Sequence, residues 1–217
     1  MNDRKAVNNM FQLSNIFNTN KTYKPETAAK PADELQRQLT ELCEQNFEIY
    51  VDTCSLLDPN GLKFLEAVEN VIPKFPGKTL NVFVSVLNEV ERVGLKEFNK
   101  YRTSNLILEK LRQLEASDIV KVVIGKNSHF SDVNFLSEFT LQSGETNVFL
   151  VTQDKALAEK VNSLPEFLGN VVHNKHLCEA KKLNSKGILE PFMTMNRNFI
   201  KEDLYNERKI CFRPLYE

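Results

Sequence analysis

The sequence of 217 residues contains no tryptophan and only seven glycines. Nowhere does it have the run of about 18 apolar residues that a membrane-spanning helix needs. It also lacks the Gly-rich phosphate loop with its lysine and the G-x-S-x-G turn around a nucleophilic serine. These absences argue against a membrane protein, a P-loop nucleotidase and a serine hydrolase of the α/β type.

Cysteine is sparse as well, and its spacing forms no framework. The four cysteines are scattered along the chain, at Cys43, Cys54, Cys178 and Cys211. We interpret them as reduced thiols, as is usual inside cells. Residues 1–20 are polar and lack the apolar core of a secretory signal. We therefore expect a cytoplasmic protein without membrane contacts.

Charge is unevenly distributed, although the net charge is only −1. Residues 1–31 hold five Lys and Arg against two acids, and residues 174–217 hold nine against six, so the middle of the chain is acidic. Basic ends around an acidic centre suit a metal-binding carboxylate site flanked by phosphate-binding segments. Ordinary solvated tails would give the same pattern. We expect a flexible N-terminal segment (1–31), one domain (32–173) and a C-terminal extension (174–217).

Between residues 47 and 172, short β-like runs alternate with amphipathic helical patterns. The predicted strands cover residues 47–51, 80–84, 118–124 and 147–152, with a fifth at Val171 and Val172. The predicted helices cover residues 32–46, 62–72, 85–93, 98–116, 132–142 and 155–164. Such alternation predicts an α/β fold with three α/β/α layers and a central parallel sheet of four to five strands.

Four acids fall where the predicted strands end. Asp52 ends the first strand, Glu89 lies one turn into the next helix, Asp132 begins the helix after the third strand, and Asp154 follows the fourth. The carboxyl ends of parallel strands share one edge of a sheet, so these acids are expected to converge. Asp132 and Asp154 could instead be helix N-caps, and Glu91 competes with Glu89 for its role.

Clustered carboxylates repel one another unless hard cations lie between them. Mg²⁺ prefers oxygen ligands, and two such ions can activate water against a phosphodiester. The other readings are weaker. Cys54 could be a nucleophile or simply a buried thiol. A receiver-type domain that is phosphorylated on Asp52 is a third functional class. A transition-metal site could use His173, His176 and Cys178, but it lacks a second ligand cluster.

Together these motifs resemble the PIN-domain nuclease family. The first strand reads IYVDTCSLL at 49–57, the second acid lies in VLNEV at 86–90, and the last lies in LVTQDKALA at 150–158. Asp132 precedes the apolar pair Phe135 and Leu136, as the third acid of the family does. The likeness covers about residues 47–172, in the family's order. At Cys54 the family has Asn or Ser, and thiols are poor hydrogen-bond partners.

The resemblance implies a metal-dependent endoribonuclease that uses Mg²⁺ or Mn²⁺. Its catalytic metal ligands would be Asp52, Glu89, Asp132 and Asp154, with Thr53 and Thr152 supporting them. Lys155, Arg92 and Lys126 lie near this edge and are candidates for binding substrate phosphates. Tyr50 and Phe130 could stack on bases or pack inside the fold.

Several functional points stay open at this stage. A toxin-like role and an RNA-processing role both fit, although this chain is longer than the family's small toxins. The expected partner is RNA, and a homodimer and an inhibitory protein partner are left open. The alternative is a catalytically silent PIN-like module that binds RNA or a protein partner through its basic ends.

Overall fold

The computed structural model describes residues 30–125, 131–142, 145–169 and 176–192. Its strands are β1 (Phe47–Val51), β2 (Leu80–Phe83), β3 (Val120–Val123), β4 (Asn147–Val151), β5 (Cys178–Leu183) and β6 (Leu189–Glu190). Its helices are α1 (Pro31–Glu44), α2 (Thr53–Leu56), α3 (Gly61–Val71), the short 3₁₀ helix η1 (Ile72–Lys74), α4 (Val84–Lys96), α5 (Phe98–Ala116), α6 (Ser131–Gln142) and α7 (Lys155–Gly169). None of the described helices is long and apolar enough to cross a membrane.

The strands form one six-stranded sheet in the order β3-β2-β1-β4-β5-β6. All neighbouring strands are parallel except β5 and β6, which are antiparallel. Strands β2 and β3 follow β1 on one side of it, and β4, β5 and β6 follow on the other side, so the strand order reverses between β1 and β4. Ligands of open α/β sheets bind beyond the carboxyl ends of the strands at such a reversal.

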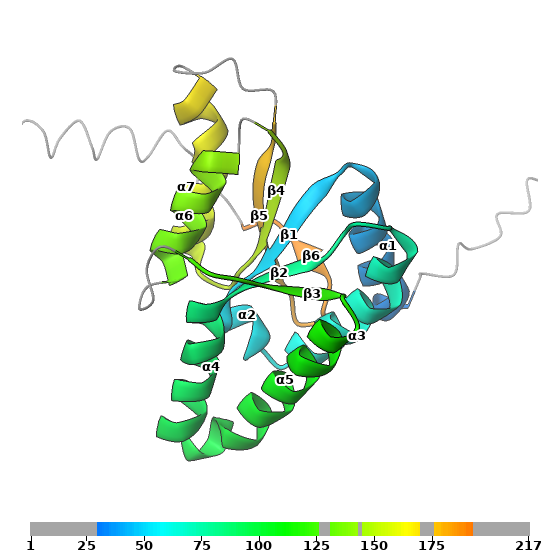
Figure 1. Cartoon of the computed structure of the whole chain (residues 1–217), viewed down its shortest axis with the longest axis vertical. Coiled ribbons are helices and arrows are strands. Elements are labelled where there is room, and N and C mark those ends of the chain that lie inside the picture. The colour runs from blue at the N-terminus through cyan, green and yellow to red at the C-terminus, as the bar shows by residue number, and fades with distance from the viewer. Residues whose placement is uncertain (1–29, 126–130, 143–144, 170–175, 193–217) are drawn as a thin grey trace, which may run out of the picture.

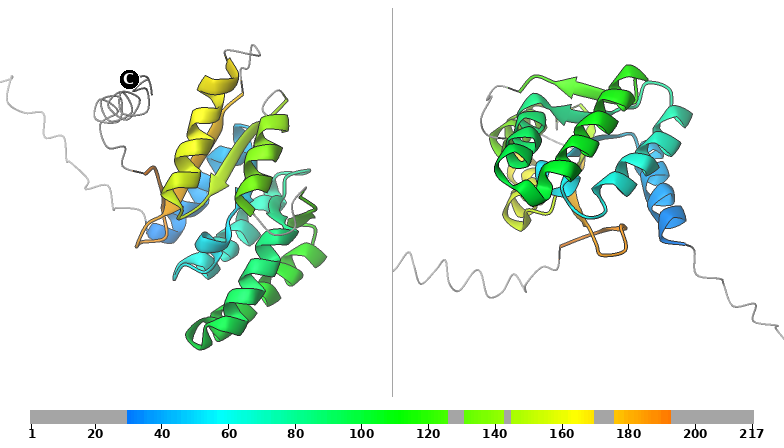
Figure 2. Two further views of the ribbon diagram at one scale, coloured as in Figure 1. Left: turned by 90° about the vertical axis from the view of Figure 1, so that its left-hand side faces the viewer. Right: turned by 90° about the horizontal axis from the view of Figure 1, so that it is seen from below.

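Helices cover both faces of the sheet, which confirms the predicted α/β class and fits its three layers. The helices α1 and α3 lie on one face, and α6 and α7 lie on the other (Figures 1 and 2). The helices α4 and α5 form an antiparallel pair that extends past the carboxyl edge of the sheet (Figure 1). This pair forms one wall of the space beyond β1.

The prediction of four to five strands is wrong, because the sheet has six strands within the described residues. Strands β5 and β6 lie in residues 174–217, which the sequence analysis sets apart as an extension. Cys178, Ala180 and Leu183 of β5 are buried, but charged residues separate them and weaken the β signal. The predicted strand at 171–172 lies outside the described residues, as do residues 1–29 and 193–217, which make up most of the terminal segments.

An aromatic cluster joins β1 and β2 to α6. The Tyr50 ring stacks on Phe83 with centroids 5.7 Å apart, and it meets Phe139 edge-on at 5.0 Å. Phe135 closes the cluster, 5.1 Å from Phe83. Tyr50 is only 2% exposed, and its hydroxyl is hydrogen-bonded to Gln142. Tyr50 is therefore a core residue, and α6 is held in place by these rings.

The α4–α5 pair depends on a glycine where the two helices approach most closely. A Cβ atom on Gly94 would lie 2.7 Å from the Cβ atom of Ser104 on α5, closer than two such atoms can pack. A single residue, Glu97, connects the helices and leaves little slack.

We expect Gly94→Ala to lower the free energy of unfolding by about 1–3 kcal/mol, because the two helices must separate. Urea unfolding of the variant measures this. Leu95→Ala is the control, because Leu95 is exposed at the neighbouring position. A Gly94→Ala protein as stable as the wild type would show that the helices are not closely packed there.

Candidate carboxylate site

The four predicted acids line one open pocket beyond the carboxyl ends of the parallel strands. The pocket has a volume of about 790 Å³, and its acidic lining residues are Asp52, Glu89, Asp132 and Asp154. Asp52 follows β1, Glu89 lies in α4, Asp132 lies in the first turn of α6, and Asp154 lies between β4 and α7. Four segments distant in sequence therefore contribute one carboxylate each, because the parallel strands and their helices meet at this edge.

Asp52 is the most enclosed of these acids, with 5% of its surface exposed. It caps the N-terminus of α2, where its Oδ1 accepts the Thr53 backbone N–H at 2.7 Å. Its Oδ2 accepts the Cys54 thiol at 2.7 Å and the Thr152 hydroxyl at 3.0 Å. Burial raises the pKa of Asp52, these three hydrogen bonds oppose that rise, and the charge of Asp132 adds to it.

Thr152 connects two of the acids. Its hydroxyl donates to Asp52 Oδ2 at 3.0 Å and accepts the backbone N–H of Asp154, also at 3.0 Å. Asp154 Oδ1 accepts the Leu157 backbone N–H at 3.0 Å, as the cap of α7 would. Asp154 therefore combines the two alternatives that the sequence leaves open, because it caps a helix and also lines the pocket.

We expect Thr152→Val to destabilise the protein by about 1–3 kcal/mol, because it removes a hydrogen-bond donor from buried Asp52 and the acceptor of the Asp154 backbone N–H. Thr152→Ser keeps the hydroxyl and should recover most of this loss. Thermal and urea unfolding of the two variants make the comparison. Equal stability of Thr152→Val and the wild type would contradict the linking role.

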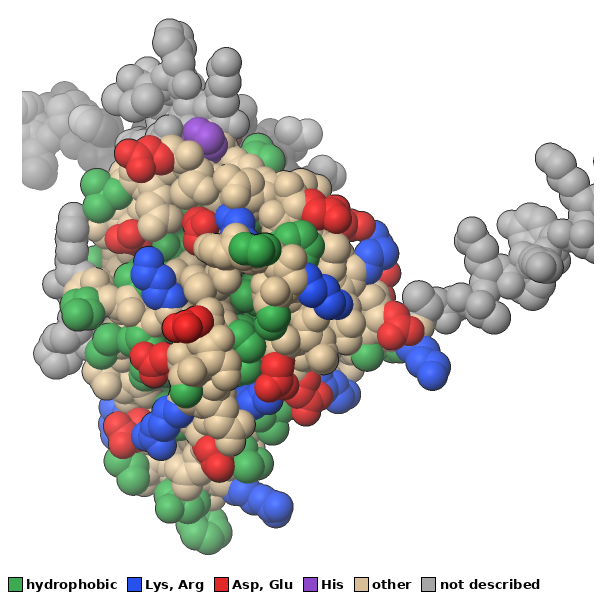
Figure 3. Space-filling view, turned by 45° about the vertical axis from the view of Figure 1, so that its right-hand side comes forward, with side chains coloured by type: hydrophobic (Ala, Val, Ile, Leu, Met, Phe, Trp, Pro, Cys, Tyr) green, Lys and Arg blue, Asp and Glu red, His purple; other side chains and the backbone are tan. Residues whose placement is uncertain are grey.

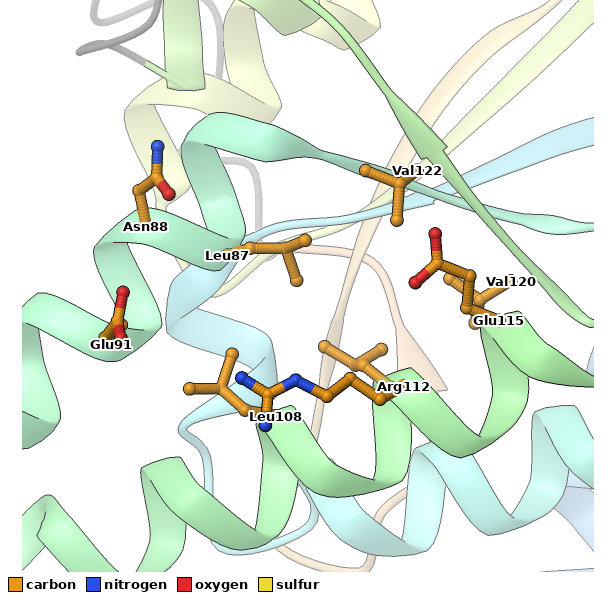
Figure 4. Close-up of a pocket in the computed structure, with 9 residues that line it drawn as sticks. Leu87, Asn88, Glu91, Leu108, Arg112, Glu115, Val120 and Val122 are labelled. Carbon is orange, nitrogen blue, oxygen red and sulfur yellow. The ribbon is translucent and has the colours of Figure 1, made fainter.

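Glu89 is held from two sides. Its Oε2 accepts the Thr53 hydroxyl at 2.9 Å and the Ser131 hydroxyl at 3.4 Å, while Arg92 lies 3.7 Å from its Oε1. Its rival Glu91 does not line the carboxylate pocket. Glu91 lies instead at a smaller, mainly aliphatic hollow of about 190 Å³ between α4, α5 and the sheet (Figure 4). The structure thus favours Glu89 as the acid that α4 contributes.

Asp132 interacts electrostatically with the other acids. Burial raises its pKa first, and the charges of Asp154 and Glu89 raise it further, while Lys160 lowers it. Since Asp132 also raises the pKa of Asp52, the four carboxylates form one electrostatic cluster. Three basic residues line the same pocket, so they offset only part of the negative charge of the four acids.

The basic residues of the pocket differ in part from those expected. Arg92 lines the pocket, together with Lys100 from α5 and Lys160 from α7. Lys155 is not among the lining residues and lies 3.7 Å from Glu159 on its own helix, while Lys126 is outside the described residues. No sequence motif marks Lys100 or Lys160, because each reaches the pocket only through the packing of its helix.

The donor set suits a hard divalent cation, although the carboxylates surround the pocket rather than meet at a point. Within the described ranges, no three His, Cys, Asp or Glu side chains are close enough to hold one ion together. Mg²⁺ keeps several waters and is commonly bound through one or two carboxylates. The chemistry of the four acids therefore fits such ions. Cys178, by contrast, is buried in β5, and His173 is outside the described residues.

Comparison with known proteins identifies no relative of this chain. No protein-family model matches the chain, and no curated protein is significantly similar to it. The fold and site define an α/β protein with a pocket of four carboxylates at the carboxyl edge of its sheet. Its function must be argued from that pocket.

Proposed function

We propose that the protein is a metal-dependent endoribonuclease that hydrolyses RNA phosphodiester bonds. One observation carries the proposal: Asp52, Glu89, Asp132 and Asp154 come from separate segments and line one pocket at the ligand-binding edge of the fold. The resemblance of the surrounding motifs to PIN-domain nucleases supports it and motivates the finer description of the fold as PIN-like. Mg²⁺ or Mn²⁺ is the proposed cofactor.

In this proposal the chain holds the carboxylates and the substrate in place. Thr152 fixes Asp52 relative to Asp154, and Thr53 fixes Glu89. A bound Mg²⁺ or Mn²⁺ would supply an activated water and offset the negative charge that develops on the phosphate. Arg92, Lys100 and Lys160, which line the same pocket, would hold the phosphates that flank the cleaved bond.

The test is incubation of the purified protein with end-labelled RNA in Mn²⁺, in Mg²⁺ and in EDTA. We expect internal cuts with either ion and none in EDTA. Because water is the attacking group, each cut should leave a linear phosphate monoester on one new end and a hydroxyl on the other. Cyclic 2′,3′-phosphate ends, which arise from attack by the neighbouring 2′-hydroxyl, would contradict the proposal, as would cleavage that persists in EDTA.

A second candidate is a catalytically silent PIN-like module that binds RNA or a protein partner. The observation that favours it is the Cys54 thiol, which lies 2.7 Å from Asp52 Oδ2 where the resembled family has Asn or Ser.

Under the nuclease proposal, Cys54→Ser should cut RNA within about threefold of the wild-type rate, because a hydroxyl can donate the same hydrogen bond. Initial cleavage rates in Mn²⁺ measure this. A wild-type protein that binds RNA without cutting it, and a Cys54→Ser variant that gains cleavage, would favour the silent module.

The proposal requires RNA as the substrate. A homodimer, an inhibitory protein partner, a cytoplasmic location and the choice between a toxin-like and an RNA-processing role remain predictions.

A further inference from the structure

A buried pair of polar side chains joins α6 to α4 near the carboxylate pocket. Asn134 of α6 is 2% exposed, and Ser85 of α4 is 5% exposed. The side-chain amide of Asn134 donates a hydrogen bond to the Ser85 hydroxyl, with Nδ2 3.0 Å from Oγ. Neither is among the described residues that line the pocket. Buried polar side chains are costly unless they are paired, so this contact restricts how the two helices can meet.

A second hydrogen bond joins the same faces of the two helices. Ser131 begins α6, and its hydroxyl donates to Glu89 Oε2 at 3.4 Å. Ser131 lies three residues before Asn134, so both are on one face of α6. Glu89 lies four residues after Ser85, so both are on one face of α4. The two hydrogen bonds therefore hold the first turn of α6 against the first two turns of α4.

The chain after β3 also packs against Asn134. A Cβ atom on Gly125, two residues after β3, would lie between 2.3 and 2.5 Å from three atoms of the Asn134 side chain, which are Cγ, Nδ2 and Oδ1. Only a glycine allows the backbone to approach the amide so closely. Asn134 is therefore enclosed by the end of β3 as well as by α4, and its position is fixed by both.

The site needs such a restriction because Asp132 and Glu89 come from different helices. Both acids line the pocket and carry like charges, so their repulsion favours separation of α6 from α4. Mg²⁺ requires nearly ideal octahedral geometry, with ligand oxygens at about 2.0–2.1 Å. Misplacement of an active-site group by about 1 Å can cost about 100-fold in rate. A fixed contact between the helices keeps the two carboxylates at one separation.

Exposed ion pairs are less able to fix such a distance. Acidic and basic side chains are interspersed over the face of the molecule in Figure 3, and pairs of this kind contribute little because solvent screens them. Arg92, for example, lies 3.7 Å from Glu89, and its side chain is 61% exposed. The contact between Asn134 and Ser85 is buried and uncharged, so it does not depend on the salt concentration.

We propose that Asn134 is a positioning residue of the carboxylate site. Through its contact with Ser85 it sets the separation of Asp132 and Glu89, and with it the affinity of the pocket for a divalent cation. The inference deepens the proposed function, on which it rests, by naming a residue that controls metal affinity without lining the metal pocket. Substitutions that break the contact should therefore weaken metal binding even while the protein stays folded.

The test is isothermal titration calorimetry of the full-length protein with Mn²⁺, at a temperature where every variant is folded. We expect Ser85→Ala to raise the Kd for Mn²⁺ by about 10- to 100-fold, as replacement of residues that support metal ligands commonly does. Ser85→Thr keeps the hydroxyl and should lie within about threefold of the wild type.

Ser104→Ala is the matched control for loss of a buried hydroxyl. Ser104 of α5 is 1% exposed, and its Oγ has no hydrogen-bond partner within the part of the chain that the structure describes. Its substitution removes the same atom as Ser85→Ala but breaks no contact between helices. We therefore expect the Kd of Ser104→Ala for Mn²⁺ to stay within about twofold of the wild type.

Asn134 itself is tested in a double-mutant cycle. Asn134→Ala should raise the Kd for Mn²⁺ at least as much as Ser85→Ala does. The double substitution should raise it no more than about twofold beyond Asn134→Ala alone, because both changes break the same contact. Fully additive effects would show that the two residues act separately and would overturn the inference.

Urea unfolding in EDTA separates positioning from a purely structural role. If Ser85→Ala lowers stability in EDTA but leaves the Kd for Mn²⁺ unchanged, the contact serves the fold alone and the inference is wrong. A Kd that rises in Ser85→Ala and returns in Ser85→Thr would support the positioning role, because the metal then responds to the hydroxyl itself.

The nuclease proposal is judged separately, by cleavage of RNA in Mn²⁺. Mn²⁺ binding that depends on Ser85, in a wild-type protein that cuts no RNA, would support the positioning role and refute the nuclease. Metal-dependent cleavage by a wild-type protein whose Kd for Mn²⁺ Ser85→Ala leaves unchanged would do the reverse. A wild-type protein that binds no Mn²⁺ would refute both.

Discussion

Replacing Asp52 by asparagine is expected to abolish metal-dependent RNA cleavage and to stabilise the metal-free protein at neutral pH. Loss of a residue that merely supports a metal ligand commonly costs 10- to 100-fold, so loss of a ligand should cost at least about 100-fold. The side chain keeps its size and its hydrogen bonds, because the amide can donate to Thr152 and Cys54 and accept from Thr53.

The gain in stability follows from the pKa of Asp52. Burial raises that pKa in the folded protein above its ordinary value. The favourable contribution of the protonated group is complete below the ordinary pKa and is lost as the pH rises through the raised one. Ionised Asp52 therefore destabilises the metal-free fold at neutral pH, and asparagine removes this penalty.

Urea unfolding in EDTA over a pH series measures this difference. The variant should gain stability relative to the wild type as the pH rises through the raised pKa. Asp118→Asn is the matched control, because Asp118 is exposed and its positive φ of 57° suits asparagine. An Asp52→Asn protein less stable than the wild type at neutral pH would show that the three hydrogen bonds to ionised Asp52 outweigh the cost of its burial.

The second large effect is expected from Phe135→Ala. Phe135 is fully buried between Tyr50, Phe83 and Phe139, and it anchors the helix that carries Asp132. Truncation of a buried phenylalanine costs about 3–5 kcal/mol, through lost apolar burial and the cavity left behind. Because these rings join α6 to β1 and β2, its first turn should loosen as well.

Equilibrium unfolding gives the magnitude, and hydrogen exchange of the α6 amides shows where the loosening occurs. Val133→Ala is the control on the same helix, since Val133 is half exposed, and it should change stability by no more than about 0.5 kcal/mol. Phe135→Leu should lie between the two. A loss below about 1 kcal/mol for Phe135→Ala would contradict the anchoring role of the cluster.

Much of the framework was predictable because local patterns and tertiary structure agree. The strand 47–51 and the helix 98–116 have the predicted bounds, since their residues have strong β and amphipathic patterns. The positions of the four acids follow from the geometry of parallel strands alone. The placement of Asp154 beside Asp52 needed no contact information, only the rule that strand ends share an edge.

Other features depend on contacts that the sequence does not reveal. The four-residue helix α2 has no periodicity to detect, and its start is set by the Asp52 cap. The charged strand β5 is held by pairing with β4. The helix predicted at 85–93 begins at Val84 and continues to Lys96, because it starts directly from β2. The sequence also does not reveal which aromatic side chains are buried. Tyr50 proves to be buried, whereas Phe98 is exposed.

The most direct test of the account is a comparison of RNA cleavage in Mn²⁺ by the wild type, Asp154→Asn and Asp118→Asn. Asp154 lines the carboxylate pocket, while Asp118 precedes β3 at the opposite end of the strand and is not among the pocket's lining residues. The account predicts that the wild type and Asp118→Asn cut RNA at similar rates and that Asp154→Asn is at least about 100-fold slower. Cleavage by Asp154→Asn at the wild-type rate would contradict the proposed carboxylate site.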